Sequence, residues 1–146
     1  MKKLLLTIVL LFLAPISLAS EANKDCLRGV IQVDICKIAT EVAHNLAENL
    51  PMKVNRNMTL YSVMAIHDSV NVTIIWNYDR NTLEESFKAN NIPISVVDDL
   101  LLTSSKNLCA FDPFKAFTYF GGKILFSYIF SDGELFDVVA LESCEE

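Results

Sequence analysis

The segment CAFDPFKAFTYFGGKILFSYIFSDGELFDVVALESC, residues 109–144, decides how the rest of this chain can fold. Two runs of alternating side chains, residues 123–130 and 134–141, flank the turn Ser131-Asp132-Gly133. Asp-Gly between two such runs is a strong short-range signal for a β-hairpin. A cysteine stands at each end of the segment, and both faces of the predicted hairpin are rather apolar. We therefore expect a hairpin bracketed by a disulfide and placed centrally in a sheet.

Four cysteines, an even number, follow the N-terminal segment: Cys26, Cys36, Cys109 and Cys144. In an exported chain they predict two disulfides, and no Cys-x-x-Cys pair suggests a metal site. Three connectivities are open, of which we favour Cys26–Cys36 with Cys109–Cys144. Ten residues of one continuous helix would separate two cysteines by ~15 Å, too far for a bridge. The first pairing therefore requires that the helix begin after about Gly29; otherwise Cys36 pairs elsewhere.

The N-terminus has the pattern of a secretory signal peptide. Lys2-Lys3 supply the positive charge, residues 4–13 are apolar apart from one threonine, and small residues precede a cleavage site after Ala19. The apolar run is shorter than the ~20 residues that span a bilayer, and no cysteine directly follows the cleavage site as in a lipoprotein. We expect a signal peptide, residues 1–19, and a single globular domain, residues 20–146, in the periplasm or outside the cell.

The charge of the chain limits its partners. Removing Lys2-Lys3 reduces the twelve basic residues to ten against eighteen acidic ones, so the net charge changes from −6 to −8. An acidic domain repels nucleic-acid phosphates and anionic membrane surfaces. It attracts a basic partner protein, although net charge also simply promotes solubility. We expect a protein partner and no nucleic acid or stable membrane insertion; a homodimer is compatible with the sequence.

Hydrophobic periodicity predicts the remaining elements. A long N-terminal helix is expected within residues 27–49, because one apolar stripe recurs at helical spacing through Ile31, Ile35, Ile38, Val42 and Leu46. β-Branched and aromatic runs predict a second hairpin, with strands at residues 59–66 and 70–78.

Capping patterns predict short helices between the two hairpins, at residues 81–90 and from about Ser95, with a helical turn at residues 112–117. The expected fold is α+β. A long N-terminal helix packs on a four-stranded, mainly antiparallel sheet made of two hairpins, with a helical insertion between them.

No pattern of catalytic residues stands out. His67 next to Asp68 has the elements of an acid–base pair, but His-Asp in a turn is usually turn chemistry, and His44 lies alone on the first helix. The sequence has no phosphate-binding glycine loop, no nucleophile elbow and no zinc-protease motif. Oxidised cysteines are not nucleophiles. We expect a protein that is not an enzyme and that needs no cofactor or metal.

Two loops are the predicted partner contacts. One contains His67 and Asp68, and the other contains Asp132 and Glu134. We expect both loops at one end of the sheet, where their charge would face a basic cleft. A second candidate surface is the outer face of the sheet, which either recognises a partner or is covered by helices. Its predicted aromatic members are Tyr78, Tyr119, Tyr128 and Phe136.

The chain resembles small exported bacterial proteins across residues 26–144. The resemblance rests on LPMKV at residues 50–54 and TLYSV at residues 59–63. It also rests on a series of landmarks: Cys109, Pro113, Gly122, Tyr128, Asp132-Gly133 and Cys144. It implies a helix with a twisted antiparallel sheet. Some proteins of similar architecture are periplasmic immunity proteins that block toxic effectors, including those of type VI secretion.

Export, acidity and the two predicted disulfides lead to a preferred hypothesis and two alternatives. The preferred function is a periplasmic immunity or inhibitor protein that occludes a basic toxin or a cell-wall hydrolase. The first alternative is a structural or assembly subunit of a secretion or envelope machine. A small hydrolase, with His67 or His44 beside a carboxylate, is the third and least favoured.

Overall fold

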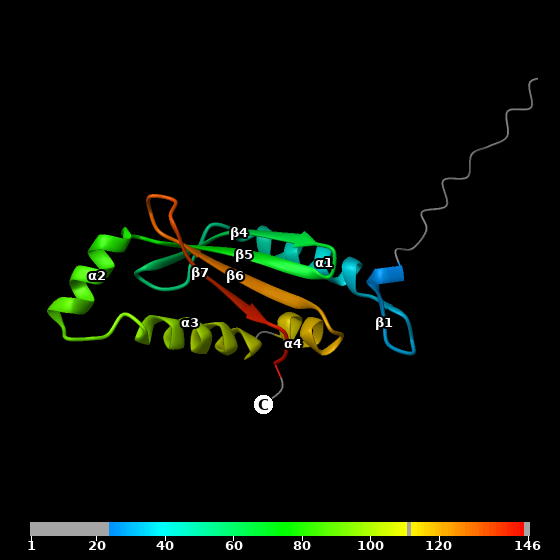
Figure 1. The fold of residues 1–146 in the computed structure, drawn as a ribbon. Helices are drawn as coiled ribbons and strands as arrows, with labels where there is room; N and C mark the ends of the chain where they lie inside the picture. The colour runs from blue at the N-terminus through cyan, green and yellow to red at the C-terminus, as the bar shows by residue number, and fades with distance from the viewer. Residues whose placement is uncertain (1–23, 111, 145–146) are drawn as a thin grey trace, which may run out of the picture.

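A five-stranded mixed sheet with helices packed against it organises the chain (Figure 1). The computed structural model describes residues 24–110 and 112–144, so the predicted signal peptide lies outside the described residues. The elements in chain order are η1 (Lys24–Cys26), β1 (Leu27–Arg28), β2 (Val33–Asp34), α1 (Ile35–Ala47), β3 (Met52–Lys53), β4 (Met58–Ile66), β5 (Ser69–Trp76), α2 (Arg80–Ala89), α3 (Val96–Asn107), η2 (Leu108–Ala110), α4 (Asp112–Tyr119), β6 (Lys123–Ile129) and β7 (Leu135–Leu141).

The strand order is β3-β4-β5-β6-β7. Both predicted hairpins, β4–β5 and β6–β7, are confirmed, and so is the α+β class. The prediction of four strands is wrong, because the short strand β3 adds a fifth member. The sheet is mainly antiparallel as predicted, but it is mixed, since β5 pairs with β6 in parallel. The parallel pairing arises because the chain returns through α2, α3 and α4 before it enters β6, and parallel neighbours need such a crossover.

One face of the sheet forms the core. In β5 the alternating residues Val70, Val72, Ile74 and Trp76 are buried, as their spacing predicts. Helix α1 packs on β4 and β5, α4 packs on β6, and α3 packs on β7. The hairpin expected to be central is central only in its first strand, since β6 lies between β5 and β7 whereas β7 is an edge strand.

The predicted long N-terminal helix is wrong at its beginning. A small hairpin of β1 and β2 comes first, and its turn has positive φ angles at Gly29 (71°) and Gln32 (49°). Helix α1 therefore begins at Ile35, and Ile31, the first residue of the predicted stripe, is 78% exposed. Beyond Ile35 the stripe packs against the core as predicted. Within the described residues, no helix combines the length and apolar character needed to cross a membrane.

A buried polar contact joins α3 to the sheet. Tyr128 of β6 is 1% exposed, and its hydroxyl lies 3.1 Å from Oγ of Ser105 on α3. The Ser105 hydroxyl also donates to the Leu101 carbonyl at 2.9 Å. Burial raises the pKa of the Tyr128 phenol above its usual value, outweighing the opposite effect of the Ser105 hydrogen bond.

This raised pKa predicts a specific loss of stability at alkaline pH. Above pH ~10 the unfolded chain ionises Tyr128 while the folded chain keeps it protonated, so the free energy of unfolding falls as pH rises. Tyr128→Phe should flatten this dependence in urea titrations between pH ~9 and ~11. Tyr61→Phe, at a residue that is 60% exposed, should retain the wild-type slope. Equal slopes in wild type and Tyr128→Phe would contradict the assignment.

Candidate interaction sites at the two ends of the sheet

Both favoured disulfides are present, with Cα–Cα distances of 5.3 Å for Cys26–Cys36 and 5.4 Å for Cys109–Cys144. The first bridge is feasible because α1 begins at Ile35, so only Cys36 of this pair lies in α1. Such bridges are characteristic of proteins that work outside the reducing cytoplasm. They support the prediction that this chain is exported.

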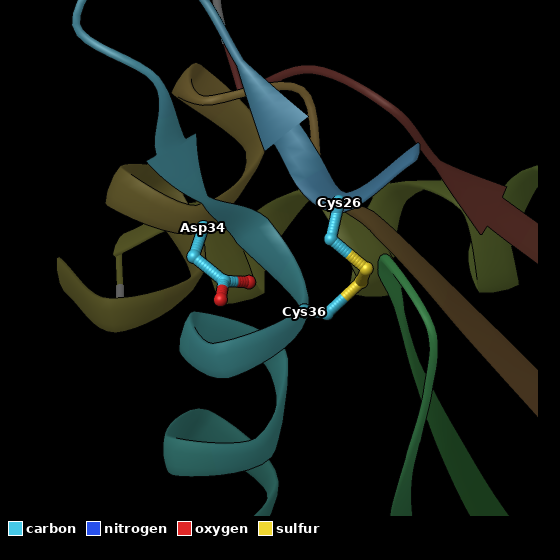
Figure 2. Close-up of side chains that lie close together, drawn as sticks. All are labelled: Cys26, Asp34 and Cys36. Carbon is cyan, nitrogen blue, oxygen red and sulfur yellow. A yellow bond between two sulfur atoms is a disulfide. The ribbon is translucent and has the colours of Figure 1, made fainter. Parts of the chain in front are cut away.

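The Cys26–Cys36 bridge lies beside a carboxylate, as Figure 2 shows. One ligand-type atom from each of Cys26, Asp34 and Cys36 lies within 4.8 Å of the others, which is a spacing that a metal ion could use. However, the two sulfur atoms are bonded to each other and offer no thiolate. The Asp34 carboxylate accepts the Lys37 backbone N–H at 3.0 Å and so caps α1. With the bridge intact, this cluster is a structural corner of the fold.

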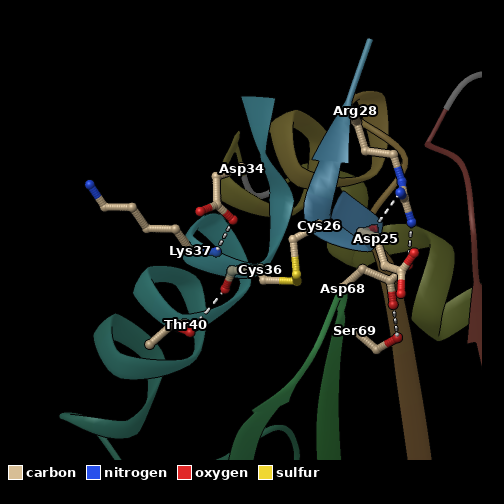
Figure 3. Close-up of a disulfide and its surroundings, with 9 residues drawn as sticks. All are labelled: Asp25, Cys26, Arg28, Asp34, Cys36, Lys37, Thr40, Asp68 and Ser69. Carbon is tan, nitrogen blue, oxygen red and sulfur yellow. Dashed lines mark hydrogen bonds and ion pairs between the residues drawn. A yellow bond between two sulfur atoms is a disulfide. The ribbon is translucent and has the colours of Figure 1, made fainter. Parts of the chain in front are cut away.

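The predicted contact residue Asp68 lies on the other side of the same bridge (Figure 3). Its Oδ2 accepts from the Arg28 guanidinium at 3.0 Å, and its Oδ1 accepts from Ser69 Oγ at 3.3 Å. The Asp68 carbonyl also accepts the Lys123 N–H at 3.1 Å. Asp68 therefore ties the β1–β2 hairpin and the start of β6 to the β4–β5 turn.

This corner encloses a shallow cavity of about 290 Å³, which contains His67 in its lining together with Arg28, Asp68 and the disulfide. The carboxylate of Asp68 is directed at Arg28 and Ser69, so the sequence neighbours His67 and Asp68 do not form the oriented acid–base pair that the hydrolase hypothesis requires. The other histidine, His44, lies 3.6 Å from Glu48 on the exposed side of α1.

His67 occupies a left-handed backbone position, with φ of 54°. A side chain in this region costs roughly 1 kcal/mol relative to glycine. His67→Gly should therefore raise the free energy of unfolding by up to about 1 kcal/mol, whereas His67→Val should lower it, because a β-branched residue fits this region worst. Urea unfolding of the three proteins tests this order, and a more stable His67→Val would contradict it.

The second predicted contact loop is held by hydrogen bonds of its own. The Asp132 carboxylate accepts the Glu134 N–H at 3.0 Å, and Glu134 Oε1 accepts from Arg80 Nε at 2.7 Å. The guanidinium of Arg80 lies over the rings of Phe130 and Phe136, with distances of 5.1 and 5.6 Å to the ring centres. Arg80 therefore fixes the first turn of α2 against the β6–β7 turn, and the sequence offered no signal for this contact.

The two predicted contact loops do not lie together. Because β5 and β6 run parallel, the turn before β5 and the turn after β6 are at opposite ends of the sheet (Figure 1). The seven residue pairs between them correspond to roughly 20 Å. The expectation that His67-Asp68 and Asp132-Glu134 share one end is therefore wrong, and they cannot form one small contact surface.

The predicted aromatic patch is also dispersed. Tyr128 is in the core, Tyr119 is 72% exposed on α4, and Tyr78 and Phe136 are half-buried. The rings of Tyr78 and Phe136 instead pack on Trp76, with centres 5.3 and 6.3 Å away. These aromatic residues therefore do not form a continuous outer surface.

A groove lies beside this aromatic packing, between α2 and the neighbouring strand ends. Its volume is about 340 Å³, and its lining residues are Asn57, Tyr78, Thr82, Leu83, Ser86 and Phe87. Burial raises the pKa of the Tyr78 phenol above its usual value. Among the described residues, the buried Nε1 of Trp76 lacks a hydrogen-bond partner. The lining mixes apolar side chains with hydroxyl and amide groups, which is a composition suited to binding.

No protein-family model and no curated protein sequence matches this chain. Three solved structures share its fold. The pilotin EpsS of the Vibrio vulnificus type 2 secretion system has a TM-score of 0.58 at 17% identity, over 77% of this chain and 93% of EpsS. The pilotin AspS of the Vibrio cholerae type II secretion system has a TM-score of 0.56 at 15% identity, over 75% of this chain and 89% of AspS.

The third structure is a Pseudomonas aeruginosa protein described as secreted, with a TM-score of 0.59 at 11% identity. The match spans 76% of this chain and 93% of that one. At these identities the likeness establishes the fold alone. None of these three structures is described as an immunity protein, so the preferred immunity hypothesis gains no support from them.

Proposed function

We propose that this protein is an exported assembly factor of a bacterial secretion machine, which was the first alternative in the sequence analysis. The observation that carries the proposal is the shared fold with two type II secretion pilotins over about three quarters of this chain and nine tenths of theirs. The assembly function therefore takes the place of the inhibitor function that the sequence favoured.

Several features of the chain support this proposal. The predicted signal peptide and the two disulfides suit a periplasmic protein. The side chains of Asp68 and Glu134 are engaged in ion pairs within the fold, at 3.0 and 2.7 Å, which suits a binding scaffold better than a reactive centre. In this proposal the protein acts by binding a subunit of the machine, without catalysis, cofactor or metal. Its acidity favours a basic segment on that subunit.

Deleting the gene in its own bacterium tests the proposal. We expect a several-fold loss of secreted proteins from the medium and fewer assembled channels in the outer membrane. A plasmid copy should restore both, whereas a copy that lacks residues 1–19 should restore neither, since it stays in the cytoplasm. Unchanged secretion would overturn the proposal. If the deletion also sensitised cells to a toxin from a neighbouring strain, the inhibitor function would replace it.

A further inference from the structure

The two edges of the sheet, at β4 and at β7, differ in how well their backbone groups are protected from pairing with a further strand. Strand β3 covers β4 only at Thr59 and Leu60, through the pairs Lys53–Thr59 and Met52–Leu60. Within the described residues, strand pairing on this side of β4 stops there, and residues 61–66 form an open edge (Figure 1). An open edge presents unpaired backbone groups that can hydrogen-bond to another strand.

The register of the β4–β5 hairpin indicates which backbone groups face outward. The two-residue turn is flanked by the pair Ile66–Ser69. In a hairpin with a two-residue turn this pair exchanges its hydrogen bonds, and alternate pairs do the same. Ser62, Met64 and Ile66 therefore bond to β5, whereas the N–H and C=O groups of Val63 and Ala65 point to the open side.

Natural edges are usually protected by charge, proline or a bulge. The whole of β4, MTLYSVMAI, contains no charged residue and no proline. Its irregularity lies between Leu60 and Ser62, so the pairing beyond it is regular. The exposed side chains beside the open edge are apolar: Tyr61 is 60% exposed, Met64 56% and Ile66 53%. This edge therefore lacks the usual protection.

The opposite border of the sheet is protected. There the carboxylate of Asp137 accepts the neighbouring Val138 N–H of edge strand β7 at 2.7 Å. A charged side chain that occupies an edge N–H opposes pairing with a further strand. The open part of β4 is therefore less protected than β7, and two copies that pair through this edge form a closed dimer.

We propose that two copies of this protein pair antiparallel through their β4 edges, with the two-fold axis at Met64. This register joins Val63 of one copy to Ala65 of the other twice, using the outward backbone groups of both. A second copy is favoured as the occupant because the strand is complementary to itself. In addition, two acidic chains repel least where β4 carries no charge. The dimer would leave the groove beside α2 accessible. The proposal of a dimer is independent of the proposed assembly function.

Light scattering and sedimentation of the mature chain, over about a hundredfold range of concentration, test the dimer. We expect a reversible monomer–dimer equilibrium. Met64→Lys places like charges opposite each other at the axis and should raise the dissociation constant about tenfold or more. Val138→Lys is the matched control, because it adds the same charge at a residue that is 47% exposed on β7. It should leave the dissociation constant unchanged.

Met64→Cys adds a test that does not depend on weakening the protein. Mild oxidation should link two copies through residue 64, since cross-strand neighbours at the axis have Cβ atoms about 5 Å apart. Val138→Cys should not be linked. A wild type that remains monomeric over the whole concentration range overturns the proposal. It does so even if a strand from another protein is found to bind the β4 edge. A dimer dissociated by Val138→Lys but not by Met64→Lys overturns it as well.

Discussion

Replacing Cys109 and Cys144 together by serine is expected to lower the free energy of unfolding by about 4 kcal/mol. The bridge closes a loop of 35 residues, and in the chain-entropy model the stabilisation grows with the logarithm of loop length. Both cysteines pack against the core, where they connect the region after α3 to the end of β7. Urea unfolding of the oxidised wild type and the double variant measures the difference.

The matched control is the other bridge. Cys26 and Cys36 are separated by only ten residues, so their replacement should cost about 3 kcal/mol in the same model. The loss for Cys109–Cys144 should therefore exceed the loss for Cys26–Cys36. A larger loss for the Cys26–Cys36 pair would mean that its corner, with Arg28 and Asp68, contributes more than loop closure does.

Gly122→Ala is expected to lower the free energy of unfolding by about 3 kcal/mol, at the upper end of the range for overpacked cores. A Cβ at this position would overlap the ring of Phe117, which is completely buried. The two residues are also joined by a hydrogen bond from the Gly122 N–H to the Phe117 carbonyl at 3.0 Å, so the backbone cannot easily move away. Chemical unfolding at neutral pH provides the measurement.

Two further variants separate the steric overlap with the Phe117 ring from the loss of glycine's backbone freedom. Adding Phe117→Leu should recover part of the loss, giving a coupling energy between the two positions. Gly133→Ala should cost about 1–2 kcal/mol through its φ of 92° alone, because a Cβ there meets no atom within 4 Å. An additive double variant would contradict the steric explanation.

The fold is the reason why an assembly function is proposed instead of the inhibitor function that the sequence favoured. Acidity and disulfides suit an immunity protein and an assembly factor equally, since both are exported binding proteins. The arrangement of strands and helices is what this chain shares with two pilotins. The predicted pairing of His67 with Asp68 failed for a related reason, because the Asp68 carboxylate bonds to Arg28 in the distant β1–β2 hairpin.

The sequence by itself determined the features that depend on near neighbours. Alternation over a few residues located β4, β5, β6 and β7, and the Asp132-Gly133 turn located the second hairpin. The sequence left three disulfide connectivities open; the favoured one is confirmed, and so is its condition that the helix begin after about Gly29. At α2 the tertiary structure shows that the helix begins at Arg80 and that Asp79 supplies the cap, because its carboxylate accepts the Thr82 N–H at 2.8 Å.

Only the tertiary structure decided the direction of β6 beside β5, which face of β6 is buried, and the partners of the predicted contact residues. A strand's alternation is the same whether its neighbour is parallel or antiparallel, so direction depends on where a long helical connection returns. Asp68 meets Arg28 forty residues away, and Glu134 meets Arg80 fifty-four residues away. Contacts over such separations arise from the packing of whole elements, which local sequence patterns do not encode.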